Sequence, residues 1–110
     1  MAKYISYYDE SNWDSSIEVM NIQNGRFDYQ ITVYDRDGSQ YWQDRRTLTS
    51  FQTERIEIRD KIPNRGQKEG LIAIEPVNGT RNEFPAMLMI CGEGQHWKEG
   101  NRFVPFIRIP

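Results

Sequence analysis

The sequence feature that most constrains the fold is a regular alternation of apolar and polar side chains over residues 27–34. The apolar phase of this segment consists of Phe27, Tyr29, Ile31 and Val33. Because successive side chains of a strand point to opposite faces of a sheet, the alternation predicts a strand with one buried face and one face in water. Asp37-Gly38 follows, and glycine accepts the positive φ of a tight turn, so residues 39–49 are predicted to form the returning strand of a hairpin.

Apolar runs of strand length recur along the rest of the chain and are separated by turn residues. These further candidate strands cover residues 15–23, 53–59, 70–76, 85–92 and 102–109. No stretch shows the sustained apolar period that a long helix requires. About seven to eight short strands predict an all-β fold, with residues 1–110 forming a single antiparallel β-sandwich of immunoglobulin-like or jelly-roll-like topology.

The composition excludes several classes of function. The chain has 110 residues, with 14 Lys and Arg against 16 Asp and Glu, and its net charge of −2 argues against a nucleic-acid partner held by bulk positive charge. A single cysteine excludes an internal disulfide, and with a single histidine it leaves too few of the usual ligands for a structural zinc site. We therefore expect no cofactor.

The chain also lacks the signatures of export and of membrane insertion. Its first residues carry one positive charge without the apolar segment of a signal peptide. No apolar run approaches the roughly 20 residues that a membrane-spanning helix needs. We expect a cytoplasmic protein without a membrane partner.

Two motifs begin like known sites but do not continue as such sites do. Asp35-Arg36-Asp37-Gly38 resembles the start of a calcium-binding loop, yet no Glu stands at its twelfth position, so we interpret it as a hairpin turn. Residues 92–97 begin like a phosphate-binding loop, but the third glycine and the following Lys-Ser/Thr are absent. His96 is the only histidine, and a small enzyme with a site near it is one alternative. We expect Cys91 to be a buried, inert thiol.

The 14 aromatic residues are the most informative functional feature of the sequence, because they are too many for the core of so short a chain. Tyr34 lies on the polar phase of its strand, and either Tyr41 or Trp42 is expected to face outward on the returning strand. Exposed rings stack on sugars or anchor a partner protein, although they can also cover an open end of a sandwich. We expect a ligand or partner surface that contains Trp13, Tyr34, Trp42, His96 and Trp97.

Three segments between residues 17 and 76 carry a resemblance to a known family. They are Ile17-Glu18-Val19-Met20-Asn21, residues 29–35 with their acidic turn, and residues 53–58 followed by Asp60 and Ile62-Pro63. In these segments the chain resembles the sensory rhodopsin transducer family of small soluble bacterial β-sandwich proteins. It departs from the family pattern at the N-terminus and after Asn78. The resemblance implies an oligomeric, non-catalytic signalling or binding protein with a sugar-like or protein ligand, and it assigns no individual functional residue.

The leading functional hypothesis is a non-catalytic interaction module that forms a homo-oligomer through an aromatic-bearing sheet face or an edge strand. The apolar tail, residues 106–110, fits either a paired last strand or a subunit contact. The second hypothesis is a carbohydrate-binding module, in which the exposed tryptophan and tyrosine rings stack on sugars.

Overall fold

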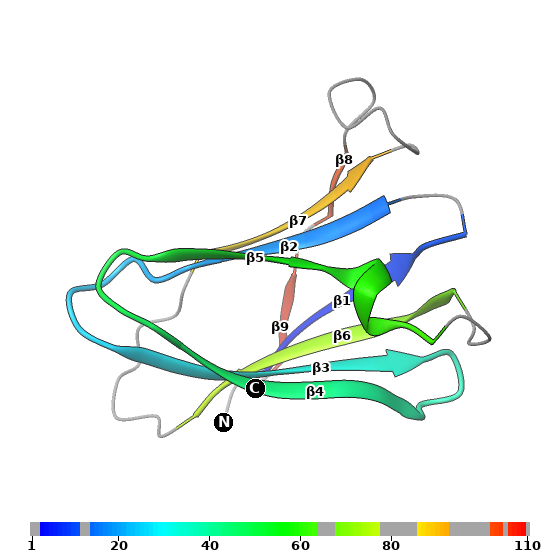
Figure 1. The fold of residues 1–110 in the computed structure, drawn as a ribbon, viewed down its shortest axis with the longest axis horizontal. Helices are drawn as coiled ribbons and strands as arrows, with labels where there is room; N and C mark the ends of the chain where they lie inside the picture. The colour runs from blue at the N-terminus through cyan, green and yellow to red at the C-terminus, as the bar shows by residue number, and fades with distance from the viewer. Residues whose placement is uncertain are drawn as a thin grey trace.

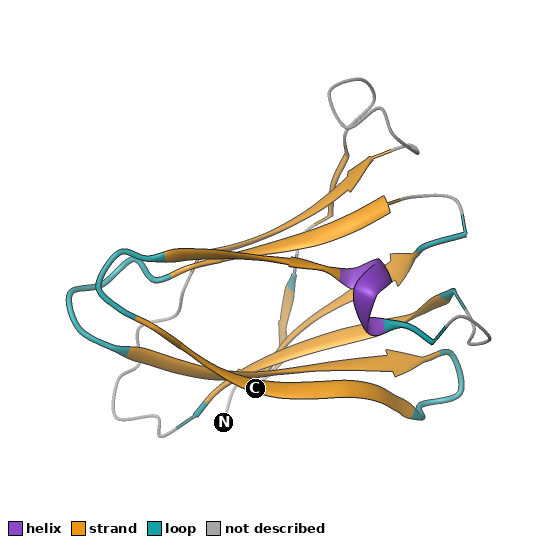
Figure 2. Cartoon of the chain, in the orientation of Figure 1, coloured by secondary structure: helices purple, strands orange, loops and turns teal. Residues whose placement is uncertain are grey.

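A computed structural model describes residues 3–11, 14–63, 68–77, 86–92, 102–104 and 106–109 of the chain. The first five strands are β1 (Lys3–Asp9), β2 (Asp14–Met20), β3 (Phe27–Asp35), β4 (Gln40–Leu48) and β5 (Thr53–Glu57). A 3-10 turn, η1 (Ile58–Lys61), precedes β6 (Glu69–Pro76), β7 (Ala86–Gly92), β8 (Arg102–Val104) and β9 (Ile107–Ile109). The all-β prediction is confirmed, because the described regular structure consists of strands and this one short turn (Figure 2).

The strands form two antiparallel sheets that lie over one another as two layers (Figure 1). The five-stranded sheet has the order β4-β3-β6-β1-β9, and the four-stranded sheet has the order β5-β2-β7-β8. The pairing is nested, because β3 pairs with β4, β2 with β5 and β1 with β6. This is the pairing of one long hairpin folded over on itself, which corresponds to the jelly-roll-like alternative. Within the described residues, no helix has the length and apolar character needed to span a membrane.

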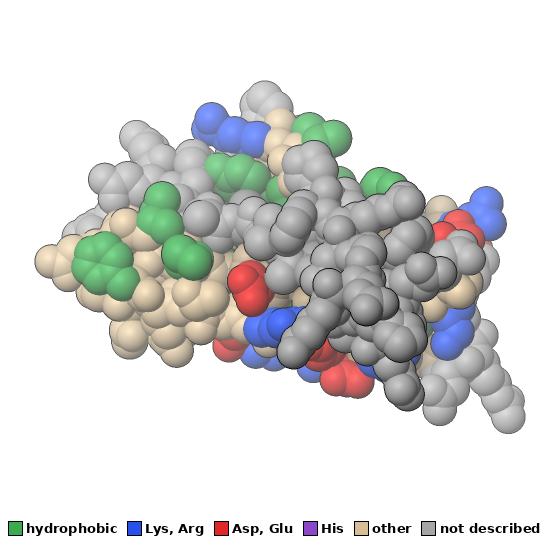
Figure 3. Space-filling model, turned by 90° about the horizontal axis from the view of Figure 1, so that it is seen from above, with side chains coloured by type: hydrophobic (Ala, Val, Ile, Leu, Met, Phe, Trp, Pro, Cys, Tyr) green, Lys and Arg blue, Asp and Glu red, His purple; other side chains and the backbone are tan. Residues whose placement is uncertain are grey.

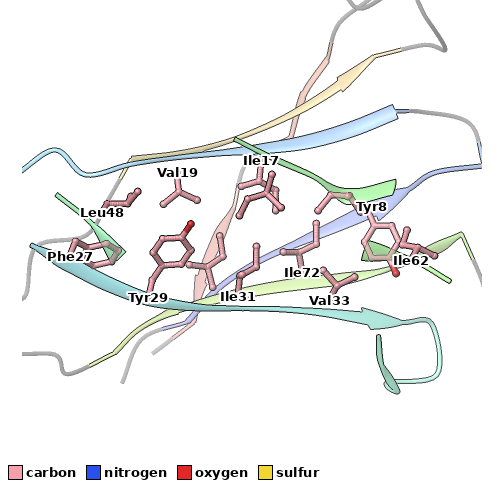
Figure 4. Packing of buried hydrophobic residues seen from close by; sticks show 13 residues of the cluster. Tyr8, Ile17, Val19, Phe27, Tyr29, Ile31, Val33, Leu48, Ile62 and Ile72 are labelled. Carbon is pink, nitrogen blue, oxygen red and sulfur yellow. The ribbon is translucent and has the colours of Figure 1, made fainter. Parts of the chain in front are cut away.

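Buried side chains from both sheets form one hydrophobic cluster between the layers (Figure 4). The alternating strand β3 behaves as predicted, since its apolar phase is buried at Phe27, Tyr29, Ile31 and Val33. Ile17 and Val19 of β2 meet these side chains from the four-stranded sheet. The turn after β3 is also confirmed, because Asp35 Oδ1 accepts the backbone N–H groups of Asp37 at 2.8 Å and Ser39 at 2.9 Å.

The strand count and two strand boundaries differ from the prediction. The described chain has nine strands rather than seven to eight. Strand β1 was not anticipated, because the buried phase of this strand includes the polar Ser6 and so hides the alternation. The tail predicted as one strand is two, and β8 and β9 belong to different sheets. The strand expected over residues 53–59 ends at Glu57, where the 3-10 turn begins.

Candidate interaction surface

The outer face of the five-stranded sheet carries apolar side chains from four strands. Tyr7 pairs with Leu71, which also pairs with Tyr34. Ile5 pairs with Ala73 on one side and with Ile107 on the other. Directly paired residues project to the same face of a sheet, so these side chains lie side by side. We call this surface the apolar sheet face, and its residues are Ile5, Tyr7, Tyr34, Leu71, Ala73, Ile107 and Ile109.

Much of the apolar sheet face is open to solvent. The exposed fraction is 67% for Ile107, 60% for Tyr7 and 48% for Leu71. The next residues along β1 and β6, Tyr8 and Ile72, are buried on the core side. Single exposed apolar side chains are common on proteins, whereas contiguous apolar patches mark interaction sites.

A shallow pocket of about 380 Å³ lies at the end of the apolar sheet face, beside the β3–β4 turn. We call it the hairpin pocket. Tyr7 and Leu71 belong to both the face and the pocket, and the remaining lining residues are Tyr8, Asp9, Asp35, Arg36, Gly38, Glu69 and Gly70. Arg36 Nε lies 4.0 Å from Glu69 Oε2, and both side chains are largely exposed. The pocket therefore combines apolar walls with charged groups.

Gly70 allows the strands around the hairpin pocket to approach closely. A Cβ atom at this position would stand 1.9 Å from the carbonyl oxygen of Tyr34 and 2.8 Å from the hydroxyl of Tyr8. That hydroxyl donates a hydrogen bond to the same carbonyl, at 2.8 Å. Burial raises the pKa of Tyr8, so the hydroxyl stays protonated as the donor at neutral pH. The pocket is thus built on a rigid corner of β1, β3 and β6.

Trp42 faces the core side of the sheet rather than the solvent side. It pairs with Val33, which is buried, and packs against the hydrophobic cluster. Lys61 Nζ lies 4.5 Å from the centroid of the Trp42 ring, and Arg46 Cζ lies 5.5 Å from it. Cations over an indole face are attracted by the ring quadrupole. Trp42 therefore closes the side of the molecule between β4 and the turn η1.

A polar network continues this closure toward β5. Arg46 Nη1 lies 3.0 Å from Glu54 Oε2, and the hydroxyl of Tyr29 donates to Glu54 Oε1 at 2.6 Å. Burial raises the pKa of Tyr29, and its bond to Glu54 raises it further. Arg46, on the core side of the edge strand β4, is thus paired with the opposite sheet through Glu54 and with Asp44 of its own strand.

Glu10 is partly buried at the corner between β1 and β2. Its Oε1 accepts the backbone N–H of Ser15 at 2.8 Å, whereas its Oε2 is buried without a hydrogen-bond partner. Burial raises the pKa of Glu10 to about 7, and Asp14 adds to the increase, while the Ser15 hydrogen bonds and Arg59 oppose it. Asp14 in turn accepts Arg59 Nη2 at 2.6 Å. No group of three or more His, Cys, Asp or Glu side chains within the described ranges could hold a metal ion.

The structure separates the two predicted surface residues that it describes. Tyr34 lies half-buried on the apolar sheet face, whereas Trp42 lies on the opposite, core side of the same sheet. The register between β3 and β4 shifts between Val33 and Tyr34, and this irregularity leaves Tyr41 and Trp42 both half-buried. Trp13, His96, Trp97 and the side chain of Cys91 lie outside the described residues.

The predicted surface did not include the exposed residues Tyr7, Leu71 and Phe51. The signal for Tyr7 was present in the alternation of residues 4–8, in which Tyr4, Ser6 and Tyr8 form the inner phase. Leu71 lies in a short apolar run, and its exposure depends on the register of β6 against β1. Comparisons of the chain with protein-family models, with curated proteins and with solved structures found no match.

Proposed function

We propose that the protein is a small non-catalytic interaction module that self-associates through the apolar sheet face. The observation that carries this proposal is the exposure of Tyr7 and Leu71, which pair directly, and of Ile107, which pairs with Ile5 on the same face of the five-stranded sheet. Covering such a face removes apolar surface from water, at roughly 25 cal/mol per Å². The resemblance to the sensory rhodopsin transducer family points to the same class of protein, an oligomeric binding or signalling module.

The charges around the apolar sheet face are compatible with a second copy of the chain as partner. Lys3 and Arg45 stand among the polar residues at one end, and Asp9 and Glu69 stand at the end with the hairpin pocket. A symmetric contact requires a surface that is complementary to itself. A border with both signs of charge meets this requirement, whereas a border of one sign would repel its copy.

The test is the oligomeric state in solution, measured by light scattering coupled to size exclusion at high micromolar concentration. We expect a mass above that of the 13.1 kDa monomer for the wild type, and a monomer for Leu71→Asp. Gln43→Glu is the matched control, because it adds a negative charge to the polar part of the same sheet face. A wild type that elutes as a clean monomer would refute the proposal.

A carbohydrate-binding module is the second candidate, and the hairpin pocket is the observation in its favour. The exposed ring of Tyr7 lies in this pocket with the carboxylates of Asp9 and Glu69. Aromatic rings stack on sugars, and carboxylates accept hydrogen bonds from hydroxyl groups. A glycan panel tests this candidate: binding to the wild type that Tyr7→Ala abolishes would support it, and no change in intrinsic fluorescence with any glycan would exclude it.

A further inference from the structure

Hydrogen bonds join the two loops that connect the sheets at the end opposite the β3–β4 turn, residues 21–26 and 49–52. The Asn21 side-chain amide donates to the carbonyl oxygens of Gly25 at 2.8 Å and Thr49 at 2.9 Å. The Asn21 backbone N–H donates to the Gln52 carbonyl at 2.9 Å. Asn21 itself is buried. These bonds hold residues 21–26 and 49–52 as one rigid unit.

This rigid unit presents a second exposed apolar patch, formed by Met20, Ile22 and Phe51. We call it the loop patch. Phe51 is 65% exposed and Ile22 is 54% exposed. Met20 pairs with Thr53, and the Asn21 N–H donates to the Gln52 carbonyl, so the three residues of the patch lie in or beside the two connected loops. Figure 3 shows hydrophobic side chains gathered at this end of the molecule, seen from the side of the four-stranded sheet.

The backbone of Phe51 is strained. Its φ is +59°, in the left-handed region that a bulky side chain rarely adopts. Glycine or asparagine would accept this conformation at lower cost. Strained backbone conformations cluster at functional sites, so an exposed aromatic ring on such a backbone motivates a binding role for Phe51. Residues 20–25 and 49–53 contain no charged side chain, so a partner can cover the loop patch without burying an unpaired charge.

The described chain has a pocket with apolar walls at its opposite end. The loop patch and the hairpin pocket lie at the two ends of the long axis of the molecule, which measures 38 Å (Figure 1). The pocket has the volume of a small ligand site and contains the exposed apolar side chains Tyr7 and Leu71. Its charged groups, including Asp9, Arg36 and Glu69, can stay in water around an uncharged ligand side chain. A Phe51 ring can reach this pocket only from another copy.

We propose that the loop patch of one copy, led by Phe51, occupies the hairpin pocket of the next copy. This inference rests on the proposed self-association, names the segment that the pocket binds, and replaces a symmetric face-to-face contact with a head-to-tail contact, because both would cover Tyr7 and Leu71. The contact is heterologous, because each copy contributes a different surface to each of its two contacts. Heterologous contacts repeat into chains or closed rings, whereas a symmetric face-to-face contact stops at a dimer. We therefore expect the mass of the wild type to rise beyond that of a dimer with concentration.

The decisive experiment is complementation between two variants, followed by analytical ultracentrifugation. Phe51→Asn keeps the pocket and loses the ring, and Leu71→Asp keeps the ring and damages the pocket. Each variant alone is expected to have an apparent Kd at least about 10-fold weaker than the wild type. An equal mixture is expected to form a one-to-one pair, because one intact ring and one intact pocket remain. Phe51→Tyr is the matched control, since it retains an aromatic ring on the same backbone, and it is expected to associate.

The outcomes separate this inference from the proposed function. If Leu71→Asp is monomeric while Phe51→Asn associates like the wild type, self-association through the apolar sheet face is supported and the role of the loop patch is refuted. If both variants are monomeric and their mixture is too, the head-to-tail contact is refuted, because a symmetric interface cannot be restored by mixing. If the wild type is a monomer, both proposals fail. Glycan binding that Tyr7→Ala abolishes, without any self-association, would assign the pocket to a sugar instead.

Discussion

Both faces of the five-stranded sheet carry apolar side chains, yet only those of the inner face are covered by the described chain itself. On the inner face, Ile31, Ile72 and Ile74 are fully buried against the four-stranded sheet. On the outer face, Tyr7, Leu71 and Ile107 stand in solvent. Because the hydrophobic effect depends on the area removed from water, the inner face stabilises the monomer and the outer face does not. This difference is the basis of the proposal that the outer face binds a partner.

The largest effect on stability is expected from truncating one residue on the inner face. Ile72→Ala removes buried methyl groups and leaves a cavity between the layers, so we expect a loss of about 2–5 kcal/mol in the free energy of unfolding. Urea denaturation at low micromolar concentration measures this loss as a shift of the midpoint with an unchanged slope. A loss below about 1 kcal/mol would mean that the layers are not packed on one another as described.

The inner face is also the part of the fold that follows most directly from the sequence. The alternation from Phe27 to Val33 is local, and it predicted which side chains of β3 are buried. The outer surface depends on which distant segments become neighbours, as in the pairing of Tyr7 with Leu71. Trp42 shows the same limit, because the register shift beside Tyr34 decides which way its ring faces. The left-handed backbone of Phe51 has no signature in an ordinary Thr-Ser-Phe-Gln segment.

Burial of a charged group has the opposite effect on stability. The partly buried carboxylate of Glu10, at the β1–β2 corner, opposes folding at neutral pH. The pKa of Glu10 is raised from its ordinary value of 4.5 to about 7. A group whose pKa is higher in the folded state contributes stability below its unfolded pKa and loses it as pH rises through the folded pKa. Stability from Glu10 is therefore present below pH 4.5 and lost between pH 4.5 and about 7, by about 2 kcal/mol once the shift is discounted for the partial exposure of the carboxyl.

Glu10→Gln removes this titration while it preserves the shape of the side chain. We expect the variant to match the wild type near pH 4.5 and to exceed it in stability by about 2 kcal/mol at pH 8, since the amide does not ionise. Urea denaturation at the two pH values measures the difference. Glu57→Gln on β5 is the control, because Glu57 is partly exposed beside Arg55. Equal pH dependence of the wild type and Glu10→Gln would contradict the assignment.

In the loop patch, the strained backbone of Phe51 lowers the stability of the monomer. Phe51→Asn is expected to stabilise the monomer by about 0.5–1 kcal/mol, because asparagine tolerates the left-handed conformation better than phenylalanine. Phe51→Ala is the matched control: it also removes the ring but retains the strain, so it is expected to be less stable than Phe51→Asn. Thermal and urea unfolding at low concentration measure both variants. A destabilised Phe51→Asn would mean that the ring contributes to the fold.

The smallest expected effect is the one that defines the outer face. Leu71→Ala, next to Ile72 on the same strand, is expected to change monomer stability by less than about 0.5 kcal/mol, because its side chain already meets solvent. The same change is expected to remove the dependence of unfolding on protein concentration, since association stabilises only the folded state. Urea midpoints measured at low and at high micromolar concentration separate these two effects. If Leu71→Ala lowered the free energy of unfolding as much as Ile72→Ala at low concentration, the outer face would be part of the hydrophobic core. The proposal of a partner surface would then be refuted.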